Sequence, residues 1–262
     1  MELGLKGRVA IVAASSHGLG KAAARGLARE GAKLAMCART EADLCAAASE
    51  IERETGAEIL ARPVDVTQEE QVREFVAATV ERFGRVDICV TNAGGPPAKT
   101  FAETTAADWR LAVDLNLMST VYFAREVLPL MQARRWGRLI TITSISVKQP
   151  IERLVLSNAV RTAVVGLVKS LSNEYAKDGV LVNNVCPGYT LTARLDELAG
   201  RLAEAGGVSN ADIHARWAQE IPMGRLGRPA EFADLVVYLA SERASYITGE
   251  SIAVDGGFVK GI

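Results

Sequence analysis

Short apolar or β-branched runs alternate along the chain with longer segments that have a helical period. The period predicts helices near 18–30, 41–55, 68–83, 105–134, 152–177 and 229–241. We expect strands in the apolar runs between them, at 8–13, 33–38, 58–64, 86–91, 137–143, 180–186 and 250–254. Such alternation predicts an α/β fold with a doubly wound, mainly parallel seven-stranded sheet and helices on both faces. The strands are almost continuously apolar, as is typical of strands buried on both faces.

One stretch, residues 190–228, interrupts this rhythm. It contains polar helical pieces, the pair Gly206-Gly207 and Pro222, but no strand. A long insertion after the carboxyl end of a strand is a common place for a substrate lid. A surface helical hairpin without a role is the alternative. Because no linker or repeat divides the chain, we expect one domain over residues 1–262, with this insertion as its lid.

The first predicted strand leads directly into a turn of small residues, and a helix follows at once. The turn reads Ala14-Ser15-Ser16-His17-Gly18-Leu19-Gly20. Small residues let the backbone approach a pyrophosphate, and the open amides at the helix start attract its charge. The turn therefore predicts a Rossmann-type dinucleotide site, in which Ala14 replaces the first glycine. If that position needs a positive φ, the alanine is strained by roughly 1 kcal/mol.

The end of the second predicted strand bears on the choice of dinucleotide. An acidic residue near this point would hold a ribose 2′-hydroxyl, whereas an arginine accommodates a 2′-phosphate. The acid's place holds Ala38, and Arg39 follows, while His17 offers a second donor to a phosphate. These residues favour NADP(H) and leave NAD(H) as the alternative cofactor. Otherwise Arg39 is an ordinary exposed charge at a strand end.

Composition narrows the function classes. A net charge of −1 gives no basic field for nucleic acid or an anionic membrane. No apolar run approaches the roughly 18 residues of a membrane-spanning helix, and no signal region is evident, so we expect a cytoplasmic protein. The four cysteines form no CxxC, and with only two histidines the sequence predicts no metal site.

Further motifs follow one another in a fixed order along the chain. These are Asp65-Val66, Asn92-Ala93-Gly94, Asn116, Pro187-Gly188, and a tail that ends in Asp255-Gly256-Gly257. As an ordered set over essentially the whole chain they resemble the short-chain dehydrogenase/reductase superfamily, and most closely its 3-oxoacyl-carrier-protein reductase-like group. The resemblance implies that Asp65-Val66 contact the adenine and that Asn92-Ala93-Gly94 also bind the dinucleotide. It further implies that Pro187, Gly188 and Thr190 lie beside the nicotinamide.

The resemblance also implies a catalytic tetrad of Asn, Ser, Tyr and Lys. Asn116 and Ser144 match the first two, but Ser157 stands at the tyrosine position and Arg161 at the lysine position. None of the five tyrosines is followed four residues later by a lysine, so the pair is not displaced elsewhere. In the family the tyrosine transfers the proton, and the lysine binds the nicotinamide ribose and lowers the pKa of the tyrosine.

Physical chemistry limits what the replacements do. A phenol with a pKa near 10 is tuned toward neutrality by a cation, but a serine hydroxyl is a far weaker acid. Arg161 stays charged and does not donate its proton, although its guanidinium could still hydrogen-bond ribose hydroxyls.

Three hypotheses remain open. In the first, a carbonyl–alcohol oxidoreductase works through a water held by Ser157 and Ser144, at a cost of about 10²–10⁴ in rate. In the second, another residue donates the proton, with Tyr189 as the first candidate and Lys148 and Tyr122 after it. In the third, the protein is a non-catalytic sensor or scaffold that binds the dinucleotide.

Two apolar features predict partners. The predicted helix is apolar on nearly every face over 155–171, and such a helix has to be covered on both sides. We expect a second subunit there, as a homo-oligomer, tetramer or dimer; burial within the monomer is the alternative. The lid carries apolar side chains that favour a substrate with an apolar portion: Leu191, Leu195, Leu198, Leu202, Trp217 and Met223.

Overall fold

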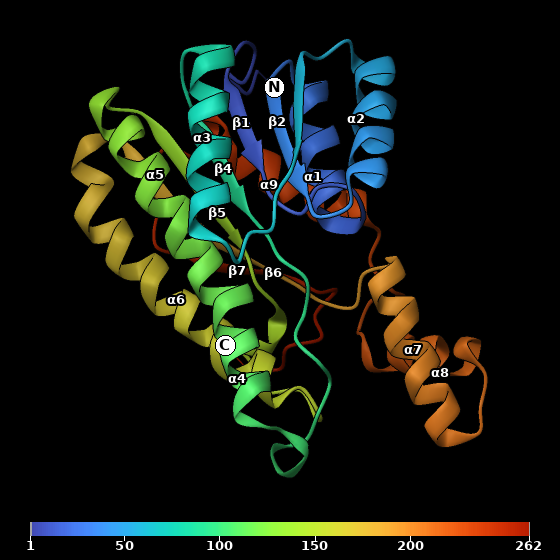
Figure 1. The fold of residues 1–262 in the computed structure, drawn as a ribbon. Coiled ribbons are helices and arrows are strands. Elements are labelled where there is room, and N and C mark those ends of the chain that lie inside the picture. The colour runs from blue at the N-terminus through green and yellow to red at the C-terminus, as the bar shows by residue number, and fades with distance from the viewer. Residues whose placement is uncertain (1, 262) are drawn as a thin grey trace.

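The computed structural model describes residues 2–261, and its centre is a parallel sheet (Figure 1). The seven strands lie in the order β3-β2-β1-β4-β5-β6-β7. Their bounds are β1 Val9–Val12, β2 Lys33–Ala38, β3 Ile59–Pro63, β4 Ile88–Thr91, β5 Gly137–Ile142, β6 Val180–Pro187 and β7 Ser251–Val254. The order reverses between β1 and β4, and ligands of such sheets bind at the carboxyl ends beside this switch point. The predicted doubly wound fold is confirmed.

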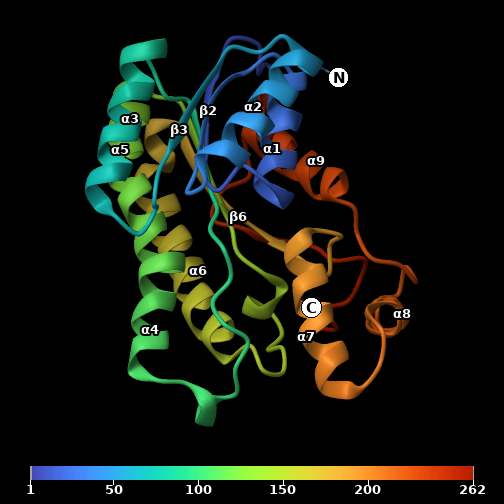
Figure 2. The ribbon, with the colours of Figure 1, turned by 45° about the vertical axis from the view of Figure 1, so that its right-hand side comes forward.

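Helices cover both faces of the sheet (Figure 2). One face carries α1 (Gly18–Arg29), α2 (Glu41–Thr55) and α9 (Pro229–Ala240), and the other carries α3 (Glu69–Phe83), α5 (Ser119–Ala133) and α6 (Val155–Tyr175). Successive strand residues point to opposite faces, so Ala10 and Val12 join one apolar cluster while Ile11 joins the other. Burial on both faces explains why the strands read as continuous apolar runs.

The segment predicted as one helix over 105–134 is helical almost throughout but not uniform. Its parts are α4 (Ala106–Ala112), a π-helical segment (Val113–Met118) and α5. Thr105 begins the segment: its hydroxyl accepts a hydrogen bond from the Asp108 amide, and the Asp108 carboxylate accepts one from the Thr105 amide. A π-helical turn inserts an extra residue and often marks a functional position. Here it turns Asn116 inward, where the side chain is buried.

The insertion predicted over 190–228 forms two helices, α7 (Ala193–Gly206) and α8 (Asn210–Glu220), which project away from the sheet (Figure 1). Gly207 ends α7 with a φ of +64°, and the Ser209 hydroxyl caps α8 by accepting from the Asp212 amide. The two helices share an apolar cluster that includes Leu195 and Trp217. Within residues 2–261, no helix combines the length and apolar character that crossing a membrane requires.

The turn after β1 carries backbone strain. Ala14 has a φ of +47°, in the left-handed region that favours glycine. The adjacent strand β2 holds this turn, since the Ser15 amide donates to the carbonyl oxygen of Cys37 at 3.0 Å. The sequence predicts strain at Ala14 if its φ is positive, and the φ is positive, so the alanine is strained.

We expect Ala14→Gly to raise the free energy of unfolding by about 0.5–1 kcal/mol. Left-handed backbone costs a non-glycine residue about 1–2 kcal/mol, and the added freedom of glycine in the unfolded chain returns about 0.5–1 kcal/mol. Urea unfolding followed by circular dichroism measures the change. Ala13→Gly is the matched control, because Ala13 is fully buried without a positive φ and should be destabilised. Equal destabilisation by both substitutions would contradict the strain.

Candidate active site

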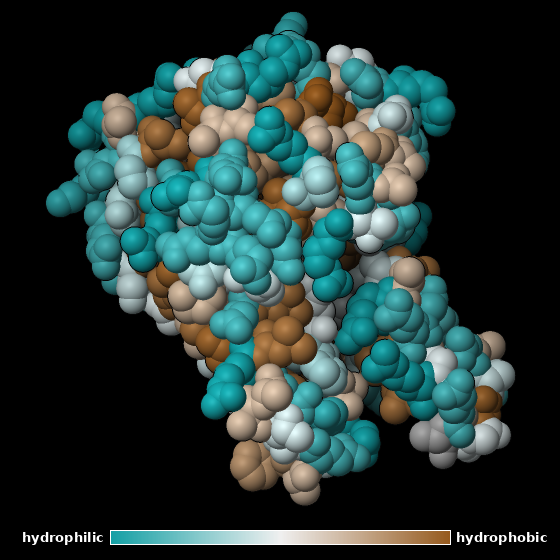
Figure 3. Space-filling model, viewed as in Figure 1, coloured by the Kyte–Doolittle hydropathy of each residue, from teal (hydrophilic) through white to brown (hydrophobic). Residues whose placement is uncertain are grey.

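A cavity of about 350 Å³ lies at the carboxyl edge of the sheet, beside the switch point. The surface is hollowed between the α7–α8 unit and the rest of the molecule (Figure 3). Five segments distant in sequence line this cavity: 14–19 in part, 92–96, 142–144, Leu154 with Ser157 and Arg161 of α6, and 187–198 in part, which runs into the start of α7. Its position matches the dinucleotide site expected from the sequence.

The glycine turn leaves room for close approach of a ligand to the backbone. A Cβ at Gly20 would lie 2.3 Å from the Ala14 carbonyl oxygen, so only glycine fits there. Gly18 has a φ of +55°. No side chain of the described chain caps the first turn of α1, which leaves its amides open toward the cavity. Open amides, a positive helix end and a turn without side chains fit a pyrophosphate.

The loop after β4 connects the turn with the catalytic positions. The Asn92 side-chain nitrogen Nδ2 lies 3.4 Å from the Ala14 carbonyl oxygen, and Asn92, Ala93 and Gly94 all line the cavity. Asn116 lies behind this loop and does not line the cavity. Its Nδ2 donates to the Gly94 carbonyl oxygen at 2.9 Å, while its buried Oδ1 has no partner among residues 2–261. Asn116 therefore positions the loop.

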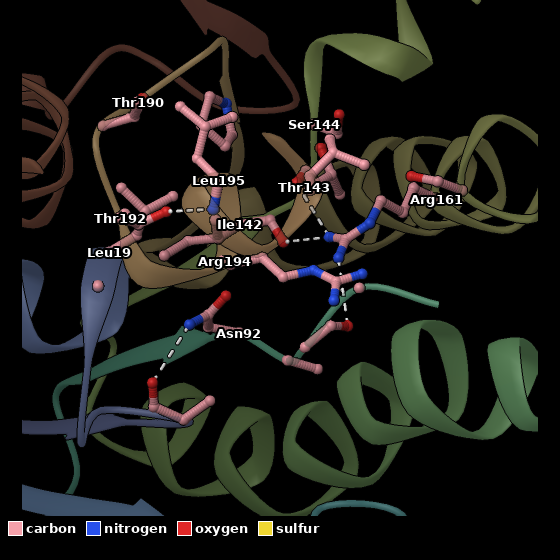
Figure 4. A pocket seen from close by; sticks show the side chains of 18 of the residues that line it. Leu19, Asn92, Ile142, Thr143, Ser144, Arg161, Thr190, Thr192, Arg194 and Leu195 are labelled. Atoms are coloured by element: carbon pink, nitrogen blue, oxygen red, sulfur yellow. Dashed lines mark hydrogen bonds between the residues drawn. The ribbon is translucent and has the colours of Figure 1, made fainter. Parts of the chain in front are cut away.

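The guanidinium of Arg161 is buried among backbone carbonyls (Figure 4). Nη1 donates to Thr143 at 2.9 Å and to Ile142 at 3.3 Å, and Nη2 lies 3.4 Å from the Gly94 carbonyl oxygen. Burial lowers the pKa of Arg161 to about 10, and the charge of Arg194 acts in the same direction. Arg161 thus remains a cation at neutral pH, and its hydrogen-bond partners within residues 2–261 include no carboxylate to balance it.

Three serines surround the position where the resemblance implies a tyrosine. The Ser144 hydroxyl oxygen accepts from the Ser146 amide at 3.1 Å, which leaves its own proton available to the cavity. Ser157 Oγ lies 3.2 Å from Ser146 Oγ, and both side chains are buried. Sequence reasoning missed Ser146, whose only signal is its place two residues after Ser144.

The structure does not bring Tyr189 to this cavity. Its ring stacks on Trp217, with centroids 4.8 Å apart, and meets the edge of Phe258 at 5.2 Å. Burial, and next the charge of Glu220, raise the pKa of Tyr189 to about 12. Tyr189 lines a second cavity of about 760 Å³, which borders the first at Leu154 and Leu198.

The apolar side chains of residues 190–228 line different cavities. Leu198, Leu202 and Trp217 line the second cavity, and Leu195 lines the first. Leu191 and Met223 are exposed and line neither. The second cavity thus combines aromatic side chains with charged ones, since Glu152, Arg153, Arg201 and Glu220 also line it.

Of the residues expected around the adenosine, His17 lines the cavity, whereas Ser15, Arg39, Asp65 and Val66 do not. Arg39 and His17 are exposed, and His17 Nδ1 lies 3.1 Å from Ser16 Oγ. The Ser15 hydroxyl is 3.3 Å from the Cys37 carbonyl oxygen, inside the protein. At the end of β3, one carboxylate oxygen of Asp65 accepts from the amide and hydroxyl of Thr67. Val66 is buried beside it.

Comparison with known proteins supports a dinucleotide-binding oxidoreductase fold. Residues 13–259 match the family model described as Enoyl-(Acyl carrier protein) reductase. The chain is 32% identical over 257 residues to the 3-oxoacyl-[acyl-carrier-protein] reductase FabG of Aquifex aeolicus, covering 98% of this chain and 99% of that one.

Solved structures of reductases resemble the chain over nearly its full length. The L-sorbose reductase of Gluconobacter frateurii, complexed with NADPH and L-sorbose, superimposes with a TM-score of 0.96 at 35% identity, over 100% of both chains. A single-residue variant of the actinorhodin polyketide ketoreductase, with NADPH, gives a TM-score of 0.93 at 34% identity, over 97% of this chain and 98% of the other. The chain therefore belongs to the short-chain dehydrogenase/reductase superfamily of oxidoreductases that act on CH–OH groups.

Proposed function

We propose that this protein is an NADP(H)-dependent oxidoreductase that interconverts a carbonyl and an alcohol without a tyrosine as proton donor. One observation carries the proposal: Ser144, Ser157 and Arg161 line a single cavity with the glycine turn and Pro187-Gly188. Two structural relatives described as reductases hold NADPH, which supports the choice of cofactor. Their substrates differ, so they leave the carbonyl compound open.

The cofactor supplies the hydride, and the chain supplies binding, orientation and charge. The open start of α1 and the turn at Gly18–Gly20 would hold the pyrophosphate, and Asn92–Gly94 with Pro187, Gly188 and Thr190 would hold the nicotinamide end. Arg39 and His17, both exposed, would hold the 2′-phosphate. NAD(H) lacks that phosphate and would leave Arg39 without its ligand.

The site stabilises a developing alkoxide through fixed donors. Ser144 has its hydroxyl proton available, and Arg161 remains charged in a buried setting, where a cation stabilises an oxyanion more than in water. The proton itself has to come from water, because neither a serine nor an arginine side chain gives one up at neutral pH. Ser157 and Ser144 line the cavity where such a water would lie, and Ser146, 3.2 Å from Ser157, lies behind them.

A non-catalytic role in binding NADP(H) is the second candidate. One observation favours it: the hydrogen bonds that Arg161 makes within residues 2–261 all go to backbone carbonyls, so it serves the fold as well as any ligand. The two functions share the cofactor site and differ only in turnover.

The proposal also includes a lid over the cavity and a contact between subunits. The α7–α8 unit would act as the lid over the cavity, since the start of α7 lines it. The outer face of α6 carries the small residues Ala159, Ala163 and Gly166, against which a second subunit would pack in a homo-oligomer. Placement in the cytoplasm stays a prediction from the sequence.

We expect NADPH to bind with clearly higher affinity than NADH in a fluorescence titration. Arg39→Ala should remove most of this preference, because a hydrogen bond to a charged group contributes about 1.5–3 kcal/mol, or roughly 10- to 150-fold in affinity. Arg29→Ala is the matched control, since Arg29 is an exposed arginine at the far end of α1. If neither dinucleotide binds, both candidate functions are wrong.

We expect Ser157→Tyr combined with Arg161→Lys to raise kcat for NADPH-dependent carbonyl reduction by about 10²-fold, because it restores a positioned acid. Ser157→Phe combined with Arg161→Lys fills the same space without a hydroxyl and should give no gain. Stopped-flow oxidation of NADPH measures both. A double variant that binds NADPH normally and stays inert on every carbonyl tested would leave the non-catalytic role as the explanation.

We expect Tyr189→Phe to keep kcat within about threefold of the parent, because a phenol whose pKa is raised to about 12 stays protonated within an aromatic cluster. The measurement is kcat between about pH 6 and pH 9, the range in which a catalytic acid would titrate. A loss of about 10²-fold or more would instead identify Tyr189 as the proton donor.

A further inference from the structure

The charges around the first cavity are unbalanced. Its lining includes the arginines Arg161 and Arg194, together with His17, but no aspartate or glutamate of the described chain. Three carbonyl dipoles surround Arg161, yet they do not cancel a full charge. Buried charges are normally paired, and the hydrogen-bond partners of the buried Arg161 within residues 2–261 include no carboxylate, so an anion would complete its surroundings.

Arg194 comes from the lid and reaches across the cavity. It is the second residue of α7, and its Nη2 donates to the Pro96 carbonyl oxygen at 3.2 Å. The same nitrogen would lie 3.4 Å from a Cβ at Gly95, where glycine leaves space for it. Figure 4 shows the Arg194 side chain extending toward the guanidinium of Arg161. Glu197 is its acidic partner within residues 2–261, 3.3 Å away, in a pair that is about half exposed and therefore weak.

The two guanidinium groups repel one another. Both side chains line the same cavity, and the charge of Arg194 adds to burial in lowering the pKa of Arg161. Arginine presents a planar fork of N–H donors that matches the two oxygens of a carboxylate. A carboxylate between them would remove the repulsion and satisfy donors that the backbone leaves unused.

We infer that Arg161 and Arg194 bind a carboxylate of the substrate, so that the protein acts on a free oxo acid and its hydroxy acid. This inference rests on the proposed reductase function and specifies its substrate class. Ser144 and Ser157 line the same small cavity, so the carboxylate has to lie within a few bonds of the carbonyl, as in a 2-oxo or 3-oxo acid. The remainder of the substrate points past Leu154 and Leu198 into the second, aromatic cavity.

The phosphates of the dinucleotide are the competing anions. They would lie at the open start of α1, on Gly18 and Leu19. The Arg194 guanidinium lies instead at Gly95 and Pro96, on the side of the cavity that Arg161 occupies. Arg161 and Arg194 therefore lie nearer the loop that would hold the nicotinamide end, where the substrate reacts, than the start of α1, where the phosphates would lie. A test has to separate the two anions.

Malonate and its neutral diamide, malonamide, are matched probes for a carboxylate site. They are titrated calorimetrically into the protein with NADP⁺ at low salt. We expect malonate to bind at least about tenfold more tightly than malonamide, and Arg194→Gln to weaken malonate about 10- to 100-fold, because one charge-assisted contact is lost. The Kd for NADPH should be unchanged in this variant. Arg216→Gln, which removes an arginine from the exposed side of α8, should change neither affinity.

Turnover gives a second and separate measurement. Acetoacetate and methyl acetoacetate differ only in the charge of the acid group, and Arg194→Gln should lower kcat/KM for the acid alone. Equal binding of malonate and malonamide would overturn the carboxylate site, and so would an equal loss of malonate and NADPH affinity in Arg194→Gln. Because the titration needs no turnover, an inert protein that still binds malonate through Arg194 would contradict the reductase function and keep the anion site.

Discussion

The buried guanidinium of Arg161 holds the active site together. It contacts the carboxyl end of β5 on one side and the loop after β4 on the other, through Thr143 and Gly94. Those two segments also carry Ser144 and Asn92, which line the cavity. A single cation thus fixes the distance from the serines to the loop that would border the nicotinamide. The N–H groups that it uses for this are no longer free to bind a ligand.

A second contact supports this arrangement from behind. Asn116 donates to the same Gly94 carbonyl oxygen that Arg161 approaches, and it faces that carbonyl because of the π-helical turn over Val113–Met118. The irregular helix, the loop and the guanidinium form one connected unit. Asn116 does not line the cavity, so its contribution to chemistry acts through the position of Gly94.

The fold was largely predictable because apolar runs of strand length and helical periods alternate along most of the chain. The π-helical turn was not, since it shifts the period by one residue within a helix that otherwise reads as regular. α6 also begins at Val155 rather than near 152, because Arg153 has a φ of +58° and stops the helix from extending backward.

The cofactor turn was predictable because its backbone geometry demands specific small residues. The surroundings of Ser157 and Arg161 were harder to predict. Motifs place the two residues along the chain, but the side chains that they meet come from segments distant in sequence. Ser146 approaches Ser157 only because the turn after β5 packs on α6, and Arg194 extends toward Arg161 only because the start of α7 lies over Gly95. Tyr189 follows Pro187-Gly188 in sequence yet turns toward Trp217, which no local pattern reveals.

The three carbonyl contacts of Arg161 also bear on substitutions at positions 157 and 161. A lysine carries all its donors on one nitrogen, whereas the guanidinium reaches carbonyls of two separate segments from two nitrogens. A lysine alone would leave some of these carbonyls unsatisfied, and a tyrosine at 157 alone would meet a cation already committed to the backbone. Neither Ser157→Tyr nor Arg161→Lys alone would therefore restore the pair usual in the family, because the two positions depend on each other energetically.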